Sequence, residues 1–305
     1  MRTQTQLWTG AVAVLMIGCN GAWGASAQAP CDDSLMQAMP GRSAQALGGH
    51  AFAQEIRGLT DDERELRIRE ELLAGNIPQF LRRLVPILLH PPAGQGLPND
   101  IVICAAPDYL AIGSDEDFML MPMRLATALS LASETGFTLP TPRIVDAIYA
   151  QATVHVAPQP LPASSEMRST EYLMRHDELV RSQRAAQDIS LGALTAGDKK
   201  DLVLTNRLWT HLDRVAIYGW HMLDGRPIQS LSTVHGWRYA DYSHGARLIS
   251  TRVFVDGKPR SIFDVMQDSR LANVLSGEGP ISNALALIRT LTQARLSAAL
   301  SESPL

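Results

Sequence analysis

Cysteine is scarce in this sequence, which contains only Cys19, Cys31 and Cys104. So few cysteines exclude a disulfide-rich scaffold and a cysteine-based zinc site. Positive charge is not in excess either, because 27 lysines and arginines stand against 31 aspartates and glutamates. This balance excludes the basic surface that nucleic-acid-binding proteins use. We therefore expect no nucleic-acid partner.

Long apolar runs are also missing. Beyond the N-terminal segment, no run approaches the roughly 20 apolar residues of a transmembrane helix. The sequence has no glycine-rich phosphate loop and no G-x-S-x-G motif. These absences argue against a membrane-spanning protein, a phosphate-loop nucleotide enzyme and a hydrolase built on a serine elbow.

The N-terminus has the pattern of a secretory signal peptide. Arg2 precedes an apolar run over 7–18, and the small residues Ala25, Ser26 and Ala27 form an A-x-A cleavage site. We predict a signal peptide over 1–27 and a secreted or periplasmic mature chain. An alternative is a loose lipoprotein box ending at Cys19, which would anchor the chain by a lipid.

Cleavage after Ala27 leaves Cys31 and Cys104. Two cysteines in an oxidising compartment favour one disulfide. The bond would close a loop of roughly 70 residues and contribute about 4 kcal/mol in the chain-entropy treatment. The alternative is that Cys104, in the apolar run IVICAA, is a buried free thiol.

The first half of the mature sequence has mainly helical signals. Thr60 and Glu63 form a capping box at the start of LTDDERELRIREELLAGN. NIPQFLRRLVPILL (76–89) predicts a second helix with a kink at Pro86, and Thr141 is a suitable N-cap for a third. The composition of 91–100 predicts a loop.

The second half contains more extended runs. An Asp224-Gly225 turn between two such runs predicts a hairpin, and RLISTRVFVDGK predicts a further strand. Earlier in the chain, 101–105 also predicts a strand. The pattern favours an α+β fold with an N-terminal helical region packed on a mainly antiparallel sheet with flanking helices.

We predict one domain over 28–305. Its parts are a helical region at about 50–190, a β-rich region that carries the site at about 199–256, and C-terminal helices at 261–300.

Two polar clusters are candidates for a site. The first is GSDED (113–117), together with Asp108 and Tyr109. Three successive acids could bind a cation or sugar hydroxyls, but their spacing is not that of a calcium loop. A solvated turn is the favoured interpretation because aspartate and serine are common in turns.

The second cluster runs from Lys199 to Arg247 and includes HGWRYADYSHGARLIS (235–250). Three of the eight histidines fall within 221–244. So many titratable side chains outside a helix are typical of a functional site, and a hydrogen-bonded corner rich in tyrosine and arginine is the alternative. We predict a catalytic centre formed by His244, Asp241, Tyr242, Arg247 and Tyr239. We predict substrate-binding roles for Trp220, Trp237, Gln229 and Lys200.

Three chemistries fit this cluster. In the first, zinc activates water and is bound by His221, His235, Asp241 and His244. In the second, no metal takes part: Asp241 orients His244 as general base, a tyrosine is the acid, and Ser243 is a weak nucleophile candidate. In the third, Arg247 or Arg238 neutralises a uronate carboxylate while Tyr242 or His244 abstracts a proton, as in a polysaccharide lyase.

The sequence therefore predicts a secreted hydrolase that acts on an extracellular or cell-envelope polymer, peptidoglycan or polysaccharide, through a His/Asp centre with zinc as a possible cofactor. A metal-independent lyase is the first alternative. A periplasmic protein that binds carbohydrate or peptide through its aromatic residues, without catalysis, is the second. The surplus of titratable groups weighs against pure binding.

Overall fold

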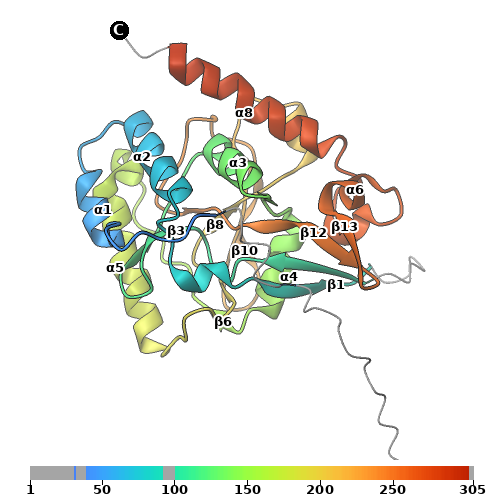
Figure 1. Cartoon of the computed structure of the whole chain (residues 1–305), viewed down its shortest axis with the longest axis horizontal. Helices are drawn as coiled ribbons and strands as arrows, with labels where there is room; N and C mark the ends of the chain where they lie inside the picture. The colour runs from blue at the N-terminus through green and yellow to red at the C-terminus, as the bar shows by residue number, and fades with distance from the viewer. Residues whose placement is uncertain (1–30, 32–38, 92–99, 302–305) are drawn as a thin grey trace, which may run out of the picture.

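The computed structural model describes residues 31, 39–91 and 100–301. The predicted signal peptide 1–27, Cys19 and most of the predicted loop 91–100 lie outside the described residues. The architecture is α+β, as predicted, with helices packed around mainly antiparallel sheets (Figure 1). In the described part of the chain, no helix is both long enough and apolar enough to span a bilayer.

The larger sheet has the order β1-β2-β12-β13, with β5 also paired to β12, and all of its pairings are antiparallel. Strand β2 (Ile101–Ala105) confirms the strand that was predicted over 101–105. Its strands are β1 (Val85–Leu89), β2 (Ile101–Ala105), β5 (Phe137–Thr138), β12 (Ile249–Val255) and β13 (Lys258–Ser261).

The predicted helix over 76–89 is wrong. A short 3-10 helix, η2 (Gln79–Arg82), is followed by strand β1. In β1, Ile87 and Leu89 are buried while Pro86 and Leu88 are exposed. This alternation has the period of a strand. Pro86 fits there because β1 is an edge strand, where a missing backbone N–H is tolerated.

The smaller sheet has the order β10-β9-β8-β11, and β8 and β11 run parallel to each other. The predicted hairpin at Asp224-Gly225 joins β9 to β10 and is confirmed. The strands are β8 (Lys200–Leu202), β9 (Ile217–His221), β10 (Pro227–Ser232) and β11 (His244–Gly245). Two further pairs are β3 (Ala111–Gly113) with β4 (Phe118–Leu120), and β6 (Val154–His155) with β7 (Thr195–Ala196).

Helices cover these sheets. α4 contacts both β1 and β9 and so connects the two sheets, while α8 packs along α3 at the top of Figure 1. Thr60 and Glu63 form the predicted capping box of α2, and Thr141 caps α4. The helices are α1 (Gly49–Glu55), α2 (Asp61–Leu73), α3 (Leu125–Glu134), α4 (Pro142–Gln151), η3 (Ser165–Arg168), α5 (Thr170–Ala186), η4 (Asn206–Trp209), α6 (Ile262–Gln267), α7 (Ala272–Leu275) and α8 (Ala284–Ser301).

A continuous set of buried apolar side chains extends from Met39 to Leu291 and includes residues of both sheets. Cys31 and Cys104 are joined by a disulfide, as predicted. The bond fastens the start of the described chain to β2, in the middle of the larger sheet.

Candidate functional site

Polar side chains are concentrated where β8 meets β11. This pairing places Lys200 opposite His244 and Asp201 opposite Gly245. Around it lie buried titratable side chains, and we call nine of them, each at most 2% exposed, the buried polar cluster. Its members are Asp108, Tyr109, His176, Asp198, Lys199, Asp201, Asp241, His244 and Arg247.

Asp241 is held in a tight polar turn just before β11. One of its carboxylate oxygens accepts hydrogen bonds from the Ser243 N–H at 2.8 Å and the Ser243 hydroxyl at 2.5 Å. The other accepts from the Tyr239 hydroxyl at 2.8 Å. Burial alone would raise the pKa of Asp241, but the neighbouring His244 and the Ser243 donors lower it to about 2. Asp241 is therefore a fixed carboxylate at neutral pH.

His244 follows Asp241 and has no solvent-exposed surface. Burial lowers its pKa to about 4, with Lys200 acting in the same direction and Asp241 opposing it. The imidazole is therefore neutral at pH 7. Neither ring nitrogen has a hydrogen-bond partner among the residues that the structure describes. Because buried polar atoms almost always have partners, a water or ligand is expected to occupy this position.

His235 and Tyr239 lie beside His244 at the partly exposed side of the cluster. Their rings stack with centroids 4.1 Å apart, and the Tyr239 ring meets the His244 ring edge-on at 5.7 Å. The structure thus brings together four of the predicted residues, His235, Tyr239, Asp241 and His244.

The predicted zinc site does not form. His221 lies apart from the other three proposed ligands, because its Nε2 pairs with Asp146 at 3.0 Å and its ring stacks on Tyr149 at 4.5 Å. Across residues 31, 39–91 and 100–301, no three His, Cys, Asp or Glu side chains are grouped so that they could hold a metal ion. The hairpin directs His221 toward α4 instead of toward His244.

Two residues that were predicted to be catalytic contact the backbone instead. Arg247 donates to the carbonyl oxygens of Ala106 at 3.0 Å and Thr195 at 2.7 Å. The Tyr242 hydroxyl accepts from the Leu161 N–H at 2.7 Å. These contacts connect the residues on either side of β11 to segments that are far away in the sequence.

The residues that are predicted to bind substrate do not lie together. Lys200 lies over the Trp220 ring, 4.9 Å from its centroid, next to His244. Trp237 is half-buried, with Arg238 stacked on it. Gln229 is on the outer strand β10, and its amide donates to the Ser230 carbonyl.

The first candidate cluster separates into two parts. Asp115 accepts from the Phe80 N–H and Asp117 pairs with His50, so these acids stabilise loops and a helix. Tyr109, in contrast, enters the buried polar cluster and donates to Asp201 at 2.9 Å. Asp108 and Tyr109 thus belong to the buried polar cluster, a link that the sequence does not reveal.

Sequence reasoning missed the buried ion groups beneath the site. Arg184 contacts Asp108 at 2.6 Å and Asp198 at 3.3 Å. Lys199 donates to the Tyr242 carbonyl at 2.6 Å, and its Nζ lies 3.2 Å from His176 Nδ1. Burial lowers the pKa of His176 to about 2, so it remains a neutral acceptor. These contacts join α5 to Asp108 and to the residues just before β8, and they give no signal in the local sequence.

Gly219 makes part of this packing possible. Its φ is +102°, and a side chain there would place Cβ 3.3 Å from the Asp201 carboxylate and 3.4 Å from the His221 ring. A glycine can adopt this backbone conformation without strain. The close approach leaves Asp201 buried between Tyr109 and His221.

The substitution Asp201→Asn is expected to stabilise the chain relative to wild type by an amount that grows with pH. Burial raises the pKa of Asp201 to about 7 from 3.8. The wild-type fold therefore loses stability as pH rises from about 4 to about 7, because the unfolded chain releases this proton first. Urea denaturation of both proteins at pH 4.5, 6 and 8 would measure the difference. A constant difference across these pH values would contradict the assignment.

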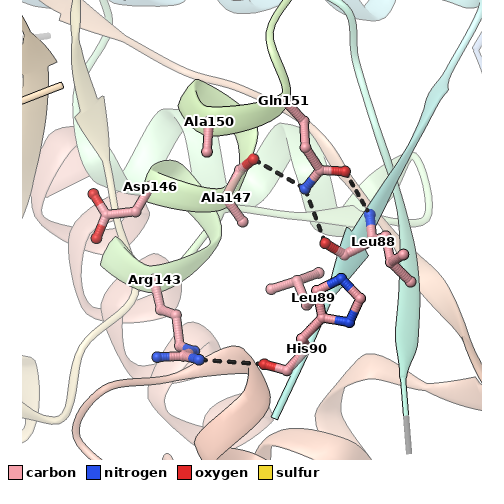
Figure 2. A pocket seen from close by; sticks show the side chains of 8 residues that line it. All are labelled: Leu88, Leu89, His90, Arg143, Asp146, Ala147, Ala150 and Gln151. Carbon is pink, nitrogen blue, oxygen red and sulfur yellow. Dashed lines mark hydrogen bonds between the residues drawn. The ribbon is translucent and has the colours of Figure 1, made fainter. Parts of the chain in front are cut away.

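A separate groove of about 560 Å³ lies between α4 and β1 (Figure 2). Gln151 exchanges hydrogen bonds with the Leu88 backbone, and Arg143 donates to the His90 carbonyl. Asp146 points away from Leu89 and His90 in this view and pairs with His221 on the other side. The polar groups of the groove are thus mainly engaged with the fold, and the buried polar cluster remains the better site.

No protein-family model, curated protein or solved structure matches the chain, so a function can be inferred only from the geometry of the buried polar cluster.

Proposed function

We propose that this protein is an exported, metal-independent hydrolase with His244 as its general base. The observation that carries the proposal is the buried, neutral His244 imidazole, whose two nitrogens lack partners within the described chain. It lies next to a fixed carboxylate and opposite a lysine. Neutral bases beside oriented charges are characteristic of acid–base catalysis.

In the proposed reaction, a water molecule bound at His244 loses a proton to the imidazole as its oxygen attacks the substrate. Asp241 stabilises the resulting imidazolium through its negative charge, and Tyr239 and Ser243 keep that carboxylate in place. Lys200, paired opposite His244, is the cation that faces the substrate. The imidazolium then returns its proton to the leaving group, and His244 becomes neutral again.

The proposed substrate is an extracellular or cell-envelope polymer. The disulfide between Cys31 and Cys104 supports an oxidising compartment, as does the predicted signal peptide. His235 and Tyr239 supply partly exposed ring surfaces next to His244, on which a sugar or a peptide could stack.

A lyase remains the second candidate because Lys200 is a cation beside a neutral base. Of the two arginines predicted for this role, Arg247 is occupied by backbone carbonyls and Arg238 stacks on Trp237. Lys200 would therefore have to neutralise the carboxylate in its place. The two reactions differ in their products, since only the lyase generates a double bond.

The experiment that tests the proposal is digestion of a panel of envelope polysaccharides and peptidoglycan in ¹⁸O-labelled water. Hydrolysis is expected to incorporate one labelled oxygen per cleavage and to continue in the presence of a chelator. Unlabelled, ultraviolet-absorbing products would identify the lyase. Loss of activity with chelator, restored by zinc, would overturn the metal-independent mechanism. Ligand binding without turnover on the whole panel would identify a binding protein.

A further inference from the structure

Lysine is used selectively in this chain. Of its three lysines, Lys199 and Lys200 are adjacent at the site, and only Lys258 lies elsewhere. Arginine supplies the other basic side chains. Lysine differs from arginine in presenting a compact ammonium group on a flexible stem, with donors that are free to rotate. Lys199 is fully engaged in the buried polar cluster, which leaves Lys200 as the cation that can face a ligand.

The backbone near Lys200 is strained. Trp220 has a φ of +55°, and it follows Gly219, which also has a positive φ. Large side chains rarely adopt this conformation, and such residues occur preferentially at functional sites. Here the strain places the indole ring beneath the Lys200 ammonium group.

Three polar side chains around this position lack hydrogen-bond partners within the described part of the chain. The Trp220 indole N–H is buried, with no acceptor among the described residues. The two His244 nitrogens are in the same situation. Within the described ranges, the Lys200 ammonium group contacts the Trp220 ring but makes no hydrogen bond or ion pair. Asp241, the nearby carboxylate, already accepts three hydrogen bonds.

We infer that Lys200 and the Trp220 indole N–H bind a carboxylate of the substrate and thereby hold the adjacent bond at His244. The inference rests on the proposed function and specifies its substrate class as an acidic polymer. An ammonium group and an N–H donor with no protein acceptor match a carboxylate in charge and hydrogen bonding. The carboxylate can belong to a uronic acid or to a peptide.

The test measures binding by calorimetry with matched pairs of probes. One pair is trigalacturonate and its methyl ester; the other is a short peptide with a free or an amidated C-terminus. At least one acidic probe is expected to bind about ten-fold or more tightly than its neutral partner. The pair that discriminates identifies the source of the carboxylate. Equal affinity within both pairs would overturn the inference, as would inorganic phosphate binding equally well.

Substitutions test whether Lys200 and Trp220 cause the preference for the acidic probe. Lys200→Met and Trp220→Phe are each expected to reduce the preference for the acidic probe, whereas Lys200→Arg should retain part of it. Lys258→Met, at an exposed position on β13, is the matched control and should have no effect. An unchanged preference in a folded Lys200→Met variant would contradict the assignment.

Chemical labelling gives a readout that does not depend on activity. An amine-reactive reagent followed by peptide mapping should modify Lys200 and Lys258, and the acidic probe should protect Lys200 alone. Acid-specific protection without turnover on any polymer would leave the carboxylate site in place and refute the hydrolase. Turnover restricted to neutral polymers would support the hydrolase and refute the carboxylate site.

Discussion

Replacing His244 by alanine is expected to lower kcat/KM by about 10²- to 10⁴-fold, the usual contribution of a general base. The expectation follows from the burial of the imidazole and from its two nitrogens, which have no partner in the described structure. The measurement is turnover of whichever polymer the panel identifies. Circular dichroism and thermal unfolding would establish that the variant is folded.

His211→Ala is the matched control, because His211 is exposed and lies outside the buried polar cluster. It should retain wild-type activity. The wild-type pH profile gives a second check: a base with a pKa of about 4 is neutral above that pH, so kcat/KM should fall only below about pH 4. Activity within three-fold of wild type in a folded His244→Ala variant would eliminate His244 as the base.

Replacing Arg184 by methionine is expected to destabilise the fold by about 3–5 kcal/mol. Arg184 contacts two carboxylates, Asp108 and Asp198, that are 1% and 0% exposed. Without the guanidinium group, two neighbouring buried negative charges would face each other without compensation. Urea denaturation at pH 7 would measure the loss.

Arg175→Met is the control for this substitution, because Arg175 is an exposed residue of the same helix, α5. Its effect should be within about 0.5 kcal/mol, as for most surface substitutions. Adding Asp198→Asn to Arg184→Met should recover part of the stability, since one unpaired charge is then removed. A loss below 1 kcal/mol for Arg184→Met would mean that this ion group is not important for stability.

The sequence predicts those parts of the fold whose causes are local. The capping box at Thr60 and the Asp-Gly turn at 224–225 both form, because each depends on residues that are near neighbours in the chain. The error at 76–89 has a physical reason. A short run that contains both Pro86 and several aliphatic residues has no clear period, and tertiary pairing with β2 decides its structure.

In the candidate site, too, the contacts with local causes are predictable from the sequence and the long-range contacts are not. Tyr239, Asp241, Ser243 and His244 come together because they lie within one turn, so their clustering is visible in the sequence. The expectation that His221 would join them fails, because Gly219 and Trp220 have positive φ and His221 pairs with α4. Asp108, His176 and Arg184 reach the site through long-range contacts that no local pattern encodes.

Several residues of the buried polar cluster share an interaction partner, and this limits which substitutions the cluster tolerates. Asp108 and Asp198 both depend on Arg184, and Tyr109 contacts both Asp201 and Arg247. The effect of replacing one of these residues therefore depends on which residues occupy the other positions. We expect strong epistasis here, so that in related sequences these positions change in compensating sets or stay fixed. Outer positions such as Gln229, on the edge strand β10, can be substituted independently of one another.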